Sequence, residues 1–391
     1  MNSVFDHVIG REGSLSLKHD GLQSTFGVSD AQAMWVADMD FSAPSAVSQA
    51  LQLRAQHPIY GYSMVPESLY EALIDWMRVQ HEWEIERDWI VLMPGVVPCL
   101  STVVMALSNE KDGVIVQPPV YFPFLSIADN TGRTLLENPL VLRLDQFDDL
   151  RYEIDFDHFE LCAKQAKILL LCSPHNPVGR VWHEDELARL LAIAKQHGLL
   201  ILADEIHADL VYPDAKHVVL GKMDVDHTHV ITAVAPSKTF NIPGLGLSAL
   251  IVPHSPSRRA IELQLSKTGV SVANPFSLVA FEAAYRHGHD WLAGLMDYLQ
   301  HTRDLVVTYF KQHIPQITVT PAEGTYLLWL DCRKLKLDDQ QLQAFFLNQA
   351  KLALSPGALF GEGGKGFMRM NIATSQANVL RALEKIKAAL V

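Results

Sequence analysis

The chain has 391 residues, of which 49% are hydrophobic and 19% charged, and its formal net charge is −12. This composition is that of a globular protein with room for two or three packed units. The acidic balance, without a basic block, argues against nucleic-acid binding, because neutralisation of phosphates dominates that affinity. No apolar run is long enough to span a bilayer, and the N-terminal segment lacks a signal-peptide core, so we expect a cytoplasmic protein without a membrane partner. The four cysteines are scattered, with no CxxC pair, which favours reduced, structural thiols.

Six short apolar runs predict strands, at residues 89–95, 113–119, 167–173, 199–205, 229–237 and 247–253. Helical patterns lie between several of them, most clearly over residues 184–198, where apolar residues recur at helical spacing before a terminal glycine. Near-continuous apolar strands with helical crossovers predict a mainly parallel sheet covered by helices on both faces.

The last hundred residues change character. Helical patterns at about 288–313 and 376–391 flank strand-like runs at 325–331 and 366–373, which predicts a smaller α+β unit. The first fifty residues have no strong strand signal and are expected to pack with it. We therefore predict a large domain over residues 50–285 and a small domain built from residues 1–49 and 286–391.

Polar side chains follow the predicted strands at their carboxyl ends, where open parallel sheets bind ligands. The first strand runs into a Pro-Gly turn that opens a helical pattern, and such a helix start favours anions. The later strands deliver an aromatic ring, an amide, a carboxylate, an imidazole and an amine, namely Tyr121, Asn176, Asp204, His207 and Lys238. Singly, each has an ordinary structural explanation as a turn, a cap or core packing. Together they suit a phosphorylated aromatic cofactor that forms a Schiff base with a lysine.

The tripeptide Ser-Lys-Thr occurs twice, but its two lysines are not equivalent. Lys267 lies late in a helical pattern that stops at Gly269, where a cation complements the helix dipole. Lys238 follows an apolar strand and has no such helix. Desolvation at that position would lower its pKa and make the amine a usable nucleophile.

Arg369 alternates with methionines in the strand-like run GFMRMNIA. It could lie on the wet face of an edge strand, or it could offer its planar fork to a substrate carboxylate.

Three further motifs are rejected. The stretch GEGGKG (361–366) matches GxGxxG but neither follows a core strand nor opens a helix, so it is no dinucleotide site. The pairs in DHTH (226–229) and HGHD (287–290) lack further ligands at metal-site spacing, so no metal is expected.

The motifs SPHNPVGRVW, ADEIHADLVY and SKTFNIPGL, in this order, resemble fold type I pyridoxal-phosphate enzymes of the aspartate aminotransferase superfamily. WVADMDF and DEIHAD make the chain similar to the carbon–sulfur β-lyase (cystathionine β-lyase) branch, among class I/II aminotransferases. The resemblance covers nearly the whole chain. It implies a PLP-dependent transferase-like α/β fold with a mainly parallel seven-stranded sheet.

The resemblance also implies roles. Lys238 would bind pyridoxal 5'-phosphate as a Schiff base and act as the catalytic base. Asp204 would pair with the ring nitrogen, and Tyr121 would stack on the ring. The remaining cofactor contacts would come from Asn176 and His207 near the ring oxygen, and from Val96, Val97, Ser237 and the other subunit's Tyr62 at the phosphate. The substrate carboxylate would bind Arg369, with Asn176 and the backbone near Ala37. Because Tyr62 crosses between subunits, the resemblance implies a homodimer with a shared active site.

The chain departs from the superfamily pattern at two phosphate-binding positions, where Ala235 and Gly246 replace a serine and an arginine. His207 stands where many aminotransferases have a tyrosine, which favours a lyase. The activity expected is α,β-elimination from an L-amino acid such as cystathionine, giving pyruvate, ammonia and a thiol. An aminotransferase using the same residues remains the alternative. A non-catalytic regulatory member of the fold is disfavoured, because Lys238 and Asp204 are both present.

Overall fold

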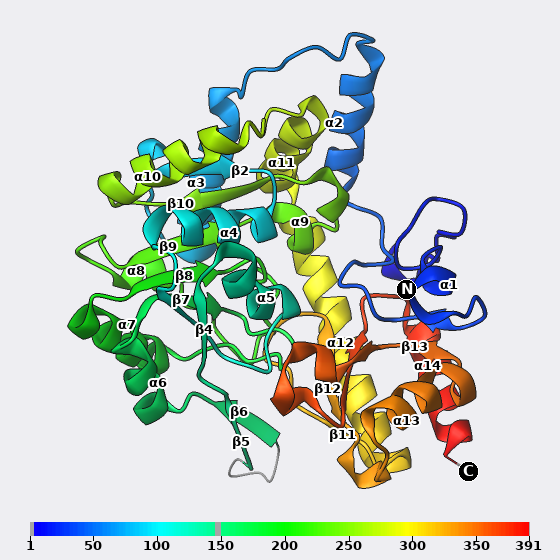
Figure 1. Cartoon of the computed structure of the whole chain (residues 1–391). Helices are drawn as coiled ribbons and strands as arrows, with labels where there is room; N and C mark the ends of the chain where they lie inside the picture. The colour runs from blue at the N-terminus through cyan, green and yellow to red at the C-terminus, as the bar shows by residue number, and fades with distance from the viewer. Residues whose placement is uncertain (1–3, 145–149, 391) are drawn as a thin grey trace.

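The computed structural model describes residues 4–144 and 150–390, and a seven-stranded sheet lies at its centre (Figure 1). The strand order is β2-β10-β9-β8-β7-β3-β4. The bounds are β2 (Ile90–Met93), β3 (Gly113–Val116), β4 (Thr134–Glu137), β7 (Ala166–Cys172), β8 (Leu200–Asp204), β9 (Val230–Val234) and β10 (Ser248–Ile251). β10 is antiparallel to both of its neighbours, whereas the pairs from β9 to β4 are parallel. All six strands expected from the apolar runs are present. The edge strand β4 was missed because its residues are partly exposed and form no apolar run.

Alternate residues of each central strand face opposite layers of helices. In β7, Ile168 and Leu170 belong to a buried cluster with α4 (Val96–Leu107), α5 (Phe122–Thr131) and α10 (Ser255–Thr268). Leu169 and Leu171 belong to the cluster with α6 (Phe156–Ala163) and α7 (Glu184–His197). Because both faces are covered, successive strand residues must all be apolar, which explains the uninterrupted runs in the sequence.

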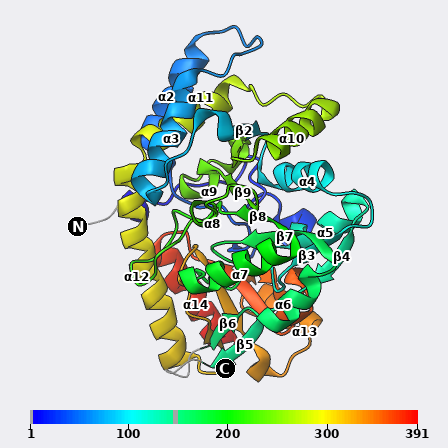
Figure 2. The same ribbon diagram turned by 90° about the vertical axis from the view of Figure 1, so that its left-hand side faces the viewer.

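A second, four-stranded sheet has the order β11-β12-β15-β14. Its strands are β11 (Thr318–Val319), β12 (Leu327–Asp331), β14 (Ser355–Pro356) and β15 (Phe367–Asn371), and its helices are α13 (Asp339–Ala344) and α14 (Gln376–Ala389). The long helix α12 (His289–His313) runs from the upper helices down to this sheet in both views (Figures 1 and 2). Helices α12 and α14 and the strands β12 and β15 lie where the sequence predicted them, whereas α13 was not predicted.

The N-terminal segment lies beside the C-terminal part, because β1 (Gln32–Ala33) pairs in parallel with β13 (Leu352–Ala353). The division into domains at residues 49/50 and 285/286 stays a prediction. The remaining helices and strands are α1 (Leu22–Phe26), α2 (Ser45–Gln56), α3 (Glu67–His81), α8 (Leu220–Met223), α9 (Pro236–Thr239), α11 (Pro275–His287), β5 (Val141–Leu144) and β6 (Leu150–Glu153). Within the described ranges, no helix is long and apolar enough to cross a membrane.

Arg180 links the central sheet to the C-terminal sheet. This side chain follows β7 and is 2% exposed. Its guanidinium donates to Glu323 at 2.9 Å and to Glu186 at 2.7 Å. Glu323, in the loop before β12, also accepts from the amide of Val181 at 2.8 Å. A buried guanidinium is tolerated only when it is paired, so this pair holds the two sheets in one arrangement.

The variant Glu323→Ala should therefore destabilise the fold. It leaves the Arg180 guanidinium short of a carboxylate, and we expect the free energy of unfolding to fall by roughly 2–3 kcal/mol. The measurement is denaturant unfolding, with the exposed Glu262→Ala as control, which should stay within about 0.5 kcal/mol of the wild type. Equal stability of the two variants would contradict this role of the pair.

Candidate functional site

A cavity of about 300 Å³ lies beyond the carboxyl ends of β7, β8 and β9, beside α4 and α9. This is the edge of the sheet where the strand ends led us to expect a site. Nine of the eleven predicted site residues line it: Ala37, Val96, Val97, Tyr121, Asn176, Asp204, His207, Ser237 and Lys238.

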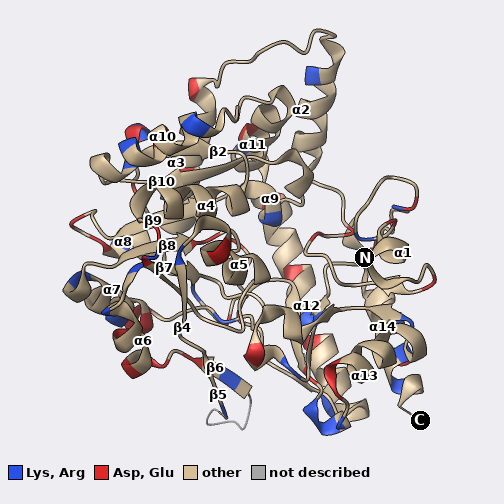
Figure 3. Cartoon of the chain, viewed as in Figure 1, with Lys and Arg blue, Asp and Glu red and all other residues tan. Residues whose placement is uncertain are grey.

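Lys238 lies on α9, a single helical turn that Pro236 begins directly after β9. The expectation that Lys238 has no helix was wrong in this respect, although one turn is too short to supply a helix dipole of much strength. Figure 3 shows the basic segment of α9 near the middle of the view, whereas many other charged segments lie nearer its outline. The Nζ atom donates a hydrogen bond to the carbonyl of Ala37 at 2.7 Å. Burial, together with the nearby Arg369, lowers the pKa of Lys238 to about 8. Lys267, by contrast, lies exposed in the last turn of α10, as expected.

Asp204 is the last residue of β8 and is 3% exposed. Burial raises the pKa of this carboxyl to about 7, against the amide of Ile206 and the charge of Lys238, which both lower it. His207 is equally buried, and its Nδ1 has no hydrogen-bond partner among the described residues. Burial and the charges of Lys238 and Arg369 lower the pKa of His207 to about 3, so the imidazole is neutral at physiological pH.

The start of α4 lies at the cavity and is suited to an anion. Gly95 precedes the helix with φ 145°, and no side chain caps the helix N-terminus. The first amides of a helix lack intrahelical partners and carry the positive end of its dipole, so those of Val96 and Val97 suit a phosphate. Ala235 and Gly246 also line this cavity and offer no side-chain donor, which leaves Ser237 as the nearby hydroxyl.

Arg369 lies on β15 and adjoins the cavity through Asn176. Its strand is paired on both sides, with β12 and β14, and the side chain is 4% exposed. The alternative of a wet edge strand was therefore wrong. Nη1 donates to Oδ1 of Asn176 at 3.1 Å, and Nη2 donates to the carbonyl of Trp35 at 2.9 Å. Burial lowers the pKa of Arg369 to about 10. Burial also raises the pKa of Tyr121, which lines the cavity.

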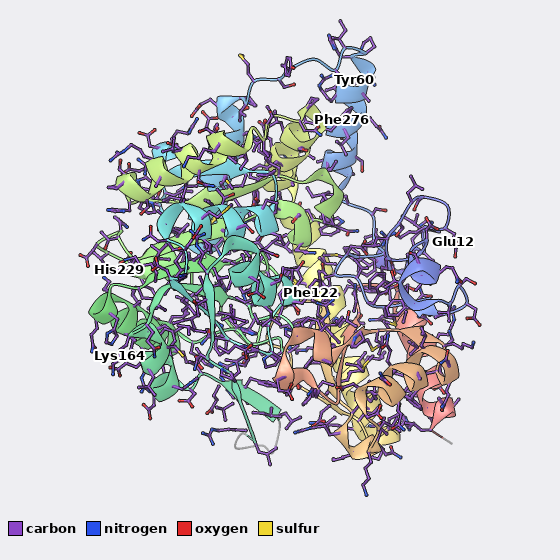
Figure 4. All side chains as sticks on the ribbon, viewed as in Figure 1. Glu12, Tyr60, Phe122, Lys164, His229 and Phe276 are labelled. Atoms are coloured by element: carbon purple, nitrogen blue, oxygen red, sulfur yellow. The ribbon has the colours of Figure 1, made fainter. Side chains whose placement is uncertain are left out.

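Tyr62 does not reach the cavity of its own chain. It lies between α2 and α3 with its side chain fully exposed. Figure 1 shows this segment at the upper edge of the molecule, and Figure 4 shows the neighbouring Tyr60 there beside Phe276.

Sequence reasoning noted WVADMDF (35–41) only as part of a motif and missed what holds it. Asn371 donates to the carbonyls of Val36 and Asp38, both at 2.6 Å. Asn241 donates to those of Met39 and Phe41 at 3.0 and 2.7 Å. Two asparagines thus replace strand partners along residues 36–41. Asn241 lies three residues after Lys238 in SKTFN, which was the signal available in the sequence.

A second missed group lies behind Lys238. The next residue, Thr239, donates its hydroxyl to Asp209 at 2.7 Å. Asp209 also accepts from Trp76 at 3.1 Å and contacts His81 at 2.8 Å. Although burial opposes it, the bond to Asp209 raises the pKa of His81. In DEIHAD the first aspartate and the histidine therefore face the cavity, while the last aspartate anchors the turn that carries the lysine.

The glycine-rich motif GEGGKG (361–366) has a defined place in the fold. GEGGKG lies in a 3₁₀ turn (Glu362–Gly364) that precedes β15 rather than opening a helix. No group of three or more potential metal ligands occurs in residues 4–144 and 150–390.

A partly buried amine of lowered pKa, a buried carboxylate and an open helix N-terminus at one cavity define a site for an anionic ligand held through a lysine. Residues 36–386 match the family model for aminotransferases of class I and II, and the chain belongs to that family. It is 39% identical to cystathionine beta-lyase PatB of Bacillus subtilis over 99% of both chains, and 32% identical to protein MalY of Escherichia coli over 94% and 93%. Among solved structures it is similar to cystalysin from Treponema denticola, which contains a pyridoxal 5'-phosphate cofactor (TM-score 0.94, 34% identity, covering 100% and 99%). The fold is accordingly the type I PLP-dependent transferase fold that the resemblance implied.

The partly buried Lys238 should destabilise the protein when no cofactor is bound. Because burial lowers the pKa of Lys238 from 10.5 to about 8, the folded chain binds this proton less tightly than the unfolded chain. The resulting loss in the free energy of unfolding is at its full value below pH 8, and it vanishes as the pH rises to 10.5. Lys238→Met should therefore stabilise the cofactor-free chain at pH 7 by roughly 2–3 kcal/mol.

The measurement is denaturant unfolding of the cofactor-free wild type and variant at pH 7 and at pH 10. The stabilisation should shrink at the higher pH. The matched control is Lys267→Met, which changes the same tripeptide on an exposed surface and should do little at either pH. A Lys238→Met variant that is less stable than the wild type at pH 7 would refute the argument.

Proposed function

We propose that the protein is a pyridoxal-phosphate-dependent carbon–sulfur β-lyase that cleaves L-cystathionine or related cysteine S-conjugates. The observation that carries the proposal is the cavity that joins the Lys238 amine, Asp204 and the first amides of α4. The 39% identity to a cystathionine beta-lyase over nearly the whole chain supports the choice of reaction.

The residues present fit this cofactor. Nδ1 of His207, which has no hydrogen-bond partner among the described residues, and the uncapped start of α4 are polar groups that a phosphorylated pyridine would satisfy. Lys238 would hold it covalently through Nζ, and Asp204 would pair with the ring nitrogen, which requires the carboxyl to be ionised beside a cation. The other contacts would be Tyr121 on the ring face, Asn176 and His207 near the ring oxygen, and Val96, Val97 and Ser237 at the phosphate.

When bound, the cofactor supplies a carbonyl that condenses with amines and a ring that accepts electron density from the substrate Cα. Lys238 acts as general base. Because the pKa of Lys238 is lowered to about 8, a part of the side chain is a free amine near neutral pH, and that amine removes the Cα proton. The Cβ–S bond then breaks, and the sulfur leaves with the bonding pair as a thiolate. With one water consumed, the products are thiol, pyruvate and ammonia.

Arg369 is the proposed residue for the substrate carboxylate, with Asn176 and the backbone near Ala37. The Asn176 amide already holds Nη1, and the Trp35 carbonyl holds Nη2, so the fork is oriented before substrate arrives. Preorganisation of this kind directs binding energy to the reacting geometry.

Incubation with L-cystathionine tests the function. The wild type should release pyruvate, ammonia and thiol, and the cofactor spectrum should recover after the turnover. Lys238→Ala should lower kcat by roughly 10²–10⁴-fold or more, because both the general base and the covalent attachment are lost. A keto acid carrying the whole substrate skeleton, with the cofactor left in its amine form, would instead establish an aminotransferase.

We propose in addition that the protein is a homodimer in which Tyr62 of each subunit reaches the cofactor phosphate of the other. The segment between α2 and α3 exposes four large apolar side chains, a pattern that favours a protein interface: Ile59, Tyr60, Tyr62 and Met64. Ala235 and Gly246 have no side-chain hydrogen-bond donors. The proposed phosphate site therefore has few side-chain partners from its own chain, and another subunit could supply one.

Subunit complementation tests the shared site. Tyr62→Ala and Lys238→Ala should each be poorly active alone. After refolding of an equal mixture, about half of the dimers are hybrids with one intact site of two, so about a quarter of the wild-type activity should return. Lys238→Ala mixed with itself is the control. Activity that never exceeds the sum of the separate variants would contradict a site shared through Tyr62.

A further inference from the structure

The carbonyl of Ala37 accepts two hydrogen bonds at the wall of the cavity. One comes from Nζ of Lys238 at 2.7 Å, and the other comes from the hydroxyl of Tyr326 at 3.0 Å. Tyr326 lies just before β12, in the C-terminal part of the chain, and is fully buried. The carbonyl therefore connects three parts of the chain: α9 with Lys238, residues 35–41, and the residue that precedes strand β12 of the second sheet.

Tyr326 can act only as a donor at this place. Burial raises the pKa of its hydroxyl, and the charge of Asp38 raises it further, so the proton stays on the oxygen. Its ring lies 6.3 Å from that of His207, which places the side chain beside the cavity rather than in the distant core. Sequence reasoning assigned this tyrosine no role.

Four other carbonyls of residues 35–41 accept hydrogen bonds from two asparagines that have no part in the proposed reaction. Asn371 holds those of Val36 and Asp38, and Asn241 holds those of Met39 and Phe41. The Ala37 carbonyl is different, since one of its donors is the reacting amine itself. A carbonyl oxygen has two lone pairs. With Tyr326 on one of them, the other is the place left for Nζ.

We propose that Tyr326, acting through the Ala37 carbonyl, is a positioning residue for the Lys238 amine in proton abstraction. The proposal rests on the function proposed above. A neutral amine that donates one hydrogen to this carbonyl keeps its lone pair free for the substrate Cα proton. After it takes that proton, the ammonium group keeps the same acceptor. The hydrogen bond fixes the position of the Lys238 amine, and the rate of proton transfer depends strongly on the position of the base.

The test compares two buried tyrosines of one core cluster. Tyr326→Phe removes only the hydroxyl that reaches Ala37. Tyr212→Phe is the matched control, because its hydroxyl is buried with no hydrogen-bond partner among the described residues. In the full chain loaded with cofactor, Tyr326→Phe should lower kcat by about 10-fold and leave KM within about 2-fold. The kinetic isotope effect of a substrate deuterated at Cα should grow, because proton abstraction becomes slower than the other steps. Tyr212→Phe should match the wild type in all three measurements.

A readout that does not depend on activity is the crystal structure of the cofactor-free chain. The contact between Nζ and the Ala37 carbonyl should persist in the wild type and in Tyr212→Phe, and it should be lost in Tyr326→Phe. Should Tyr326→Phe fail to fold, Tyr326→Met, whose flexible side chain fills the space without a donor, replaces it with the same expectations.

An unchanged kcat and isotope effect, or a lysine that keeps its contact with Ala37 in the variant crystals, would overturn the proposal. Failure of the proposed function is distinguishable from this. In that case the wild type itself would release no thiol from any cysteine S-conjugate, while the crystals would still show whether Tyr326 holds the lysine in place.

Discussion

The structure depends on keeping a partly buried amine and a buried carboxylate together at one cavity. Burial moves the pKa of Lys238 down to about 8 and that of Asp204 up to about 7, so both groups titrate near neutrality instead of several units away from it. Neither shift favours folding, because each reflects a charged form that burial disfavours. The surrounding fold must supply the stability that the site withdraws, which the two-sided packing of the central sheet does.

That requirement explains how the elements around the site are arranged. The parallel strands β7, β8 and β9 end side by side, so residues far apart in sequence arrive at one edge without long loops. Asp204 ends its strand, and Lys238 follows β9 after a short turn. The anchoring contacts lie on the far side of that turn, where Thr239 bonds Asp209. In each of these short segments, some side chains can then face the cavity while others anchor the segment to the fold.

Much of this could be predicted from the sequence, because the central strands are covered on both faces and appear as uninterrupted apolar runs. The same logic located Asp204, His207 and Lys238, since each follows such a run. It failed at β4, an exposed edge, and at Arg369, whose alternating pattern fits an edge strand or an interior one equally well. The asparagines Asn241 and Asn371 were missed for a different reason: a side chain that replaces a strand partner leaves no periodic signal, and its partner lies some 200 or more residues away in the chain.

Tyr326 belongs to that last class, and it shows why local patterns cannot reveal such residues. In sequence it is one aromatic residue at the start of an apolar strand, which is the usual sign of core packing. Only the fold brings its hydroxyl to the same carbonyl that receives the lysine amine. The C-terminal part of the chain therefore contributes a second group to the site, in addition to the guanidinium of Arg369. Through the Ala37 carbonyl, Tyr326 also contacts the Lys238 amine, on which proton abstraction would depend. A small displacement between the two sheets would therefore shift the Nζ atom. The ion pair between the buried Arg180 and Glu323, which lies in the loop that leads into the same strand, restrains such a displacement.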